Sequence, residues 1–156
     1  MGKVPIQFDL PLPPSINEAW KNANGARAPT KRYTDWRKAA TWRLVEQGAP
    51  GPNSDRSLVN QNVVIIIAVD RPHHRKADVD NRVKPILDTL VHNRVLKDDS
   101  LVTALAVSWQ EMTRETLTAR VMIVAVTDLF LTFHPDASAT TGGWYLMNTE
   151  PQEEAA

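Results

Sequence analysis

The sequence predicts a single α+β domain, with a mixed β-sheet and two main helices in the order β-α-β-α-β-β. The chain of 156 residues has the length of one domain with a hydrophobic core. Two segments carry apolar residues at helical spacing, and four others have the β-branched or alternating composition of strands. We expect the domain to cover residues 1–127, and residues 128–156 to form an acidic, flexible extension.

The first predicted strand and helix are separated by a loop. Residues 4–12 form a short strand that ends at a proline-rich stretch, and the polar residues 22–29, with Gly and Pro, form the loop. Thr34 is the expected N-cap of a helix that ends at Gln47, before Gly48. The apolar face of this helix, at i, i+4 spacing, consists of Trp36, Ala40 and Leu44.

A second loop at residues 50–57 leads to the most apolar strand. Residues 62–69 are rich in β-branched side chains, the pattern of a strand buried on both faces. Asp78 or Asp80 is expected to cap the next helix, which continues to His92. Its apolar stripe consists of Val79, Val83, Ile86, Leu87 and Leu90. Pro85 removes a backbone donor, so the first turn should be distorted.

Two further strands are predicted at residues 101–111 and 116–126. The four residues between them, 112–115, predict a hairpin. Beyond residue 128 the periodic pattern fades into a stretch rich in Ala, Ser, Thr and Gly. Trp144 and Tyr145 are the side chains in this extension that are able to dock on the body.

Composition excludes several classes of function. Without cysteine, disulfides, thiolate zinc sites and cysteine nucleophiles are all ruled out. No apolar run reaches the ~18 residues of a membrane helix, and no signal-peptide core is present, so we expect a cytoplasmic protein with no membrane partner. The net charge is zero, but residues 128–156 carry five acids and no Lys or Arg. The remaining body has 18 basic and 13 acidic residues, which is compatible with a polyanionic partner and equally with ordinary surface charge.

The acidic residues that follow the apolar strand are the main functional signal. Asp78 and Asp80 stand two residues apart, and Lys84 shares a helical face with Asp80 and Asp88. Converging carboxylates without thiolates suit Mg²⁺ or Mn²⁺, which catalyse phosphoryl chemistry. By itself this pattern has a simpler interpretation, as a loop with a helix cap and surface i,i+4 pairs, and the Asp98-Asp99 pair as a turn.

The pattern Asp78-x-Asp80-Asn81-x-x-Lys84, with Asp99 just before a strand, resembles the RusA family of Holliday junction resolvases. The segment Pro13-Pro14-Ser15-Ile16-Asn17 is similar to the proline-rich Ser-x-Asn segment of that family. The resemblance spans roughly residues 4–126. One position departs from the family, which often has a basic residue where this chain has Ala77. Lys76 or Arg75 is the candidate substitute for that phosphate contact.

The resemblance implies a homodimer that nicks two opposing strands of a four-way DNA junction with Mg²⁺ or Mn²⁺. It implies that Asp78, Asp80 and Asp99 bind the metal and that Lys84 is the essential lysine. Asp88 and Asp98 rank below these residues. Asp98 should point away from Asp99, and Asp88 lies two turns from the strand end. Compact resolvases of this type are familiar from phages and prophages, which makes a phage or prophage origin an expectation of the resemblance.

The remaining site predictions concern DNA contacts. The basic loop after the buried strand is the preferred backbone-binding segment, and His73 and His74 fit phosphate contacts better than metal ligands. The cations before the first long helix suit contacts to phosphates. The expected DNA-binding residues are Asn17, Lys31, Arg32, Arg71, His74, Arg75 and Lys76.

The sequence therefore predicts a metal-dependent endonuclease that resolves branched DNA. A metal-activated water would attack the phosphorus, and Lys84 would stabilise the developing charge. Two alternatives remain open at this point: a protein that binds DNA structures without cutting them, and a metal-dependent Asp-x-Asp transferase. The lack of a glycine-rich nucleotide loop counts against the transferase.

Overall fold

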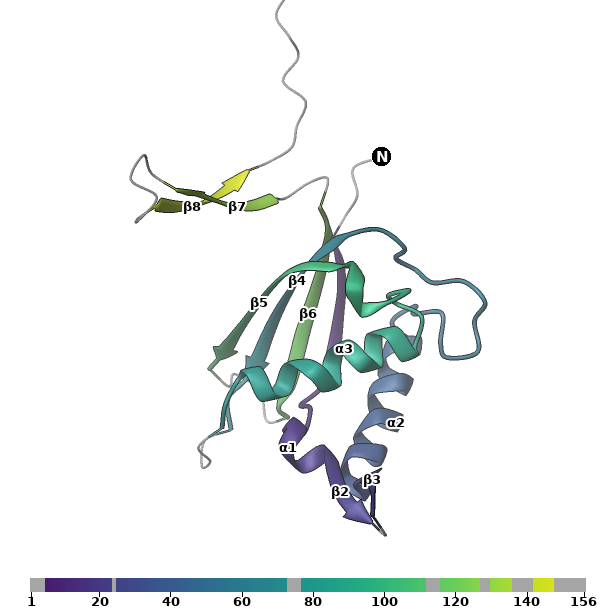
Figure 1. The fold of residues 1–156 in the computed structure, drawn as a ribbon. Helices are drawn as coiled ribbons and strands as arrows, with labels where there is room; N and C mark the ends of the chain where they lie inside the picture. Colours follow the sequence, from purple (N-terminus) through teal and green to yellow (C-terminus); the bar gives the residue numbers. More distant parts are fainter. Residues whose placement is uncertain are drawn as a thin grey trace, which may run out of the picture.

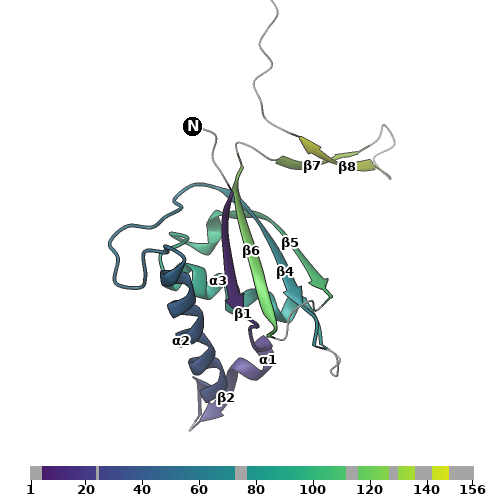
Figure 2. The same ribbon diagram turned by 180° about the vertical axis from the view of Figure 1, so that it is seen from behind.

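In a computed structural model of the chain, residues 5–23, 25–72, 77–111 and 116–126 are described, with the backbone alone for strands at 130–135 and 142–147. The body is a four-stranded mixed sheet with two long helices on one face (Figures 1 and 2). The strand order is β1-β6-β4-β5. The four strands are β1 (Ile6–Pro11), β4 (Val63–Asp70), β5 (Val102–Gln110) and β6 (Thr118–Ala125). This arrangement confirms the predicted α+β class.

Helices α2 (Lys31–Glu46) and α3 (Val83–His92) cover one face of the sheet (Figure 1). The predicted face of α2 is confirmed, because Trp36, Ala40 and Leu44 are all buried. The core beneath the helices also contains alternate residues of the strands, which are Phe8, Leu10, Val63, Ile65, Ile67, Val69, Ala119, Val121 and Ile123. In the described part of the chain, no helix is both long and apolar enough to cross a membrane.

The predicted hairpin between the last two body strands is wrong. β5 pairs with β4 in parallel, and β6 pairs with the other edge of β4 in antiparallel orientation. β4 therefore lies between them, because its long apolar run is the best partner for both. The prediction that β4 is buried on both faces is only partly right. Ile66 and Ala68 point to the face without a helix and are half-buried.

The loop predicted at residues 22–29 is instead a hairpin of β2 (Trp20–Ala23) and β3 (Ala26–Pro29). Gly25 has φ +80°, so the glycine that signalled a loop makes the tight turn between two strands. The N-cap of α2 is Thr30 rather than Thr34, because the Thr30 hydroxyl accepts a hydrogen bond from the Tyr33 amide. The helix thus begins one turn earlier than expected.

Neither Asp78 nor Asp80 caps α3. A 3₁₀ turn, η1 (Asp80–Arg82), precedes the helix, and its side chains make no capping hydrogen bond. Pro85 is the third residue of α3. The N–H groups in the first turn of a helix have no acceptor within the helix, so the N–H that proline lacks costs α3 no hydrogen bond. Pro85 therefore does not break α3, which is α-helical from Val83 to His92, and the 3₁₀ turn precedes the helix.

The residues after the body contain a second small sheet. Strands β7 (Phe130–Pro135) and β8 (Gly142–Met147) pair in antiparallel orientation, in a stretch where the sequence predicted a flexible extension. Trp144 and Tyr145 lie in β8, opposite Phe133 and Thr132. The acidic residues of 148–156 lie outside the described residues.

Asp70 ends β4 as a fully buried carboxylate. Its Oδ2 accepts hydrogen bonds from the Thr118 amide at 2.9 Å and hydroxyl at 3.0 Å, and its Oδ1 accepts one from Arg120 at 2.9 Å. Burial raises the pKa of Asp70, but these hydrogen bonds outweigh burial and hold the pKa below its ordinary value. Asp70 thereby fixes the start of β6 against the end of β4.

We expect Asp70→Asn to lower the free energy of unfolding at neutral pH by about 2–3 kcal/mol, because the Arg120 and Thr118 donors lose their anion. A carboxyl group whose pKa is lower in the folded than in the unfolded state contributes its full stabilisation of the fold above its unfolded pKa. That stabilisation is lost as the pH falls through the folded pKa. Urea unfolding should therefore show that the stability difference between the wild type and Asp70→Asn shrinks as the pH falls below the ordinary carboxyl pKa. Asp55→Asn, at an exposed loop carboxylate, is the matched control. A difference that does not change with pH would contradict this account.

Candidate active site

Asp78 and Asp80 are exposed carboxylates at the start of the α3 segment. Asn81 contacts both of them: its side-chain amide donates to Asp78 Oδ2 at 3.3 Å, and its backbone amide donates to Asp80 Oδ1 at 2.9 Å. The sequence pattern contained Asn81 but gave it no role. In the structure this one residue orients both aspartates, while most of their lone pairs face solvent.

Lys84 lies on the first turn of α3 and forms two ion pairs. Its ammonium is 2.8 Å from Asp88 Oδ1 and 3.1 Å from Asp99 Oδ2. The hydrogen bonds to Asp88 and Asp99 raise the pKa of Lys84, so it remains a cation throughout the neutral range. Asp88, which was ranked lower from the sequence, is thus a direct partner of the candidate lysine.

Asp98 and Asp99 have different surroundings. Asp98 caps the 3₁₀ turn η2 (Asp99–Leu101), and its carboxylate accepts a hydrogen bond from the Ser100 amide at 2.9 Å. Hydrogen bonds to Ser100 lower the pKa of Asp98. Asp99 is exposed and turned toward Lys84. The two side chains therefore serve different partners, as expected from the sequence.

The donor set fits a hard cation in its chemistry, since Asp78, Asp80 and Asp99 offer exposed carboxylate oxygens and no soft ligand. Within the described ranges, no three His, Asp or Glu side chains are gathered closely enough to hold an ion between them. Asp99 is held by Lys84 instead. The arrangement is a pair of exposed aspartates held by Asn81, and a third carboxylate, Asp99, that is bound to Lys84.

The predicted DNA contacts have mixed surroundings. Lys31 pairs with Asp35, and Arg32 pairs with Glu18 at 2.7 Å, so both cations have carboxylate partners within the chain. Arg71 is exposed at the end of β4, where its backbone amide donates to Gln110. Asn17 is exposed on α1 (Ile16–Ala19). His73, His74, Arg75 and Lys76 lie outside the described residues.

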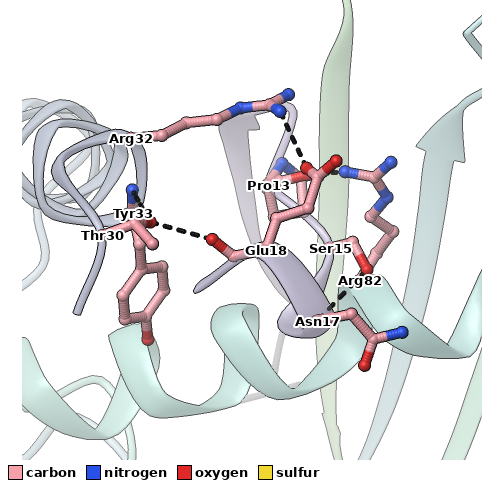
Figure 3. Close-up of polar contacts among 8 residues, drawn as sticks. All are labelled: Pro13, Ser15, Asn17, Glu18, Thr30, Arg32, Tyr33 and Arg82. Atoms are coloured by element: carbon pink, nitrogen blue, oxygen red, sulfur yellow. Dashed lines mark hydrogen bonds and ion pairs between the residues drawn. The ribbon is translucent and has the colours of Figure 1, made fainter. Parts of the chain in front are cut away.

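Arg82 is a residue that sequence reasoning missed. It belongs to η1 and is buried, and its guanidinium donates to the carbonyl oxygen of Pro13 (Figure 3). The contact joins the proline-rich segment to the aspartate segment across 69 residues of chain. In Figure 3 the Asn17 side chain extends away from this contact. A signal was available, because Arg82 is a basic residue two positions after Asp80 that the predicted site leaves without a role.

Comparison with known proteins places the chain in a family. Residues 11–124 match the family described as Endodeoxyribonuclease RusA, a range that includes the proline-rich segment and every candidate carboxylate. The chain belongs to the RusA family. It is 29% identical over 93 residues to the Crossover junction endodeoxyribonuclease RusA of Aquifex aeolicus strain VF5, covering 60% of this chain and 68% of the relative. A relative of the same name from Enterobacteria phage HK97 is 31% identical over 93 residues, covering 60% and 72%.

The RusA family assignment identifies the chain as a member of a family of endodeoxyribonucleases, and the predicted resemblance is confirmed. Ala77 occupies the position before the first aspartate and is half-buried. In this RusA-family chain the candidate replacements, Arg75 and Lys76, lie just before the described segment.

We expect Arg82→Met to destabilise the fold and to impair nicking by this RusA-family chain. The substitution leaves the buried Pro13 carbonyl without its donor, which should lower the free energy of unfolding by about 1–3 kcal/mol. Arg82→Lys retains a donor and should recover part of the loss. Urea unfolding, followed by nicking at a temperature where each variant is folded, separates the two effects. Equal stability of Arg82→Met and the wild type would contradict the structural role.

Proposed function

We propose that the protein resolves four-way DNA junctions by metal-dependent hydrolysis of phosphodiester bonds. The observation that supports this most directly is the match to the endodeoxyribonuclease family over a range containing Asp78, Asp80, Lys84 and Asp99. Two relatives that are named crossover junction endodeoxyribonucleases support the choice of branched DNA as substrate. The exposed position of all four side chains is what a bulky DNA substrate requires.

Asp78 and Asp80 would hold a Mg²⁺ ion, or Mn²⁺ in its place, and Asp99 would complete the carboxylate set. When bound, the ion supplies positive charge to the phosphate oxygens and lowers the pKa of a coordinated water. Asn81 keeps the two aspartates oriented before substrate arrives. A site that is oriented in advance needs less reorganisation during the reaction.

Lys84 would stabilise the negative charge that builds up on the phosphate as the attacking water forms its bond to phosphorus and the leaving oxygen departs. The Lys84–Asp99 ion pair is then a resting arrangement. A DNA phosphate offers Lys84 a competing anion, and the release of Asp99 would make its carboxylate available to the metal. In the resting arrangement the hydrogen bonds to Asp88 and Asp99 raise the pKa of Lys84, so the lysine is already a cation when the phosphate arrives.

A homodimer is part of the proposal. Two copies related by a two-fold axis would place two identical sites at the two symmetry-related strands of a junction. Such a dimer would nick the two strands symmetrically. The proposed role of this reaction is in DNA recombination and repair.

The test is a cleavage assay with a labelled four-way junction, an unbranched duplex of the same sequence, and Mg²⁺ or EDTA. We expect paired nicks at symmetric positions in the junction, only with the metal, and little cutting of the duplex. Equal cutting of duplex and junction would refute junction specificity. Binding without nicks in Mg²⁺ and Mn²⁺ would support a binding protein instead, and neither binding nor nicks would refute the proposal entirely.

A further inference from the structure

A surface groove lies between α2 and the end of α3, and Asp78, Asp80, Lys84 and Asp99 are not among its lining residues. Its volume is about 420 Å³, and its lining includes Arg37, Lys38, Thr41, Trp42, Val45 and His92. Trp42 is 75% exposed and Val45 is 47% exposed. Burying a side chain as large as tryptophan is favourable, so one left this open in a groove indicates a surface for a partner.

The α2 side of the groove carries uncompensated positive charge. The helix has five basic residues and two acids, and those acids pair with cations outside the groove, Asp35 with Lys31 and Glu46 with Arg43. Within the described ranges, neither Arg37 nor Lys38 has an ion-pair partner, although Lys38 helps to lower the pKa of Asp35. Arg37 lies over the Tyr33 ring, 5.8 Å from its centroid.

The α3 side adds further positive charge. Burial lowers the pKa of His92, and the nearby charges of Arg37 and Arg94 lower it further. Arg37 of α2 and Arg94, two residues beyond the end of α3, therefore both act on His92. Arg94 is exposed and has φ +57°, a left-handed conformation that favours glycine after a helix. A charged side chain at such a position costs backbone energy that a glycine would avoid.

The groove and the candidate active site share one face of α3. Lys84, Asp88 and His92 are spaced four residues apart, so they lie within about 80° of one another around the helix. At 1.5 Å per residue, Lys84 and His92 are about 12 Å apart along the axis. A duplex arm that contacts Lys84 and runs along this face of α3 would pass the groove.

We propose that the α2–α3 groove binds the phosphate backbone of one duplex arm of the DNA substrate, through Arg37 and Lys38 beside Trp42, with Arg94 acting at its His92 edge. The proposal rests on the nuclease function proposed above and adds a second contact surface to it. The charge decides the occupant. Among the described residues, Arg37, Lys38 and Arg94 form no ion pair with a carboxylate, so their charges are available to the phosphates of DNA. Trp42 then packs its ring against the sugars between successive phosphates.

The test measures junction binding without divalent metal across a range of salt concentrations. Arg37→Gln with Lys38→Gln should weaken binding by about tenfold and reduce the slope of log K against log salt by about 2. Because Arg37 contacts Tyr33, a second double variant, Lys38→Gln with Arg94→Gln, leaves that contact in place. The matched control, Arg27→Gln with Arg56→Gln, removes two exposed cations that do not line the groove and that have no ion-pair partner among the described residues. Thermal unfolding checks that each variant is folded.

A reduced slope in both groove variants, with an unchanged slope in the control, supports the proposal. If the wild type binds junctions and folded groove variants bind with the same slope, the inference fails while the nuclease proposal stands. If the wild type binds no junction, both fail. If Trp42→Ala changes the sedimentation coefficient and leaves DNA binding unaltered, the groove joins two copies of this chain and the inference is refuted.

Discussion

Asp80→Asn is expected to retain junction binding and to lose nicking by about a hundredfold to a thousandfold or more in saturating Mg²⁺. Asp80 is exposed, and its only hydrogen bond within the described residues is the one that Oδ1 accepts from the Asn81 amide. Asparagine keeps that acceptor, so the local structure should survive. What it loses is the negative charge that a hard cation needs. Single-turnover cleavage and gel-shift binding, measured on the same junction, separate these two effects.

The matched control for this variant is Asp98→Asn. Asp98 is also an exposed aspartate of the cluster, but its carboxylate caps η2 by accepting from Ser100, which asparagine also does. We expect its nicking rate to stay within a few-fold of the wild type. Full cleavage by Asp80→Asn in Mg²⁺ would remove Asp80 from the proposed metal site. Equal losses in both variants would show that cluster charge matters, rather than a specific ligand.

Lys84→Met should have the second large effect, a loss of nicking of about a hundredfold or more. Methionine retains the length and apolar stem of lysine but has no charge to place against the phosphate. Lys84→Arg keeps the charge in a wider, planar group and should recover only part of the rate. The variant also leaves Asp88 and Asp99 without their shared cation.

Asp88→Asn tests whether Lys84 acts directly. It removes one of the two ion pairs but leaves Lys84 bound to Asp99. Because exposed ion pairs contribute little to stability, we expect an intact fold and a nicking rate within about tenfold of the wild type. If Asp88→Asn is as inactive as Lys84→Met, the acid is part of the reacting machinery. A normal rate for Lys84→Met would refute the role of the lysine.

Local patterns in the sequence predicted the elements well and their pairing poorly. The face of α2 and the stripe of α3 follow from 3.6-residue spacing, which each helix carries within itself. The position of β4 between β5 and β6 depends on competition among whole strands, which a short connection between two predicted strands does not reveal. The β2–β3 hairpin was missed because a glycine turn looks the same in a loop and between two short strands.

The candidate site shows the same division. The motif spacing identified Asp78, Asp80, Lys84 and Asp99, because residues that can bind a metal or a phosphate are recognisable by their type. The residues that hold these side chains in place could not be identified from the sequence. Asn81 acts through one side-chain and one backbone hydrogen bond, and Arg82 through a contact with a distant carbonyl. Such roles depend on which distant segments meet, so only the fold reveals them.

The pairing of β1 with β6 has a consequence for how the protein becomes active. Ile6 lies opposite Ile123, so the two ends of the body are neighbours in one sheet. Pairings this distant in sequence slow folding, since a long loop must close before any contact stabilises it. During synthesis, β1 has no partner until β6 has left the ribosome, and the Pro13–Arg82 contact lies beside that unfinished sheet. Chains that stop short of β6 should therefore be harmless to DNA, and nuclease activity should arise only with the finished domain.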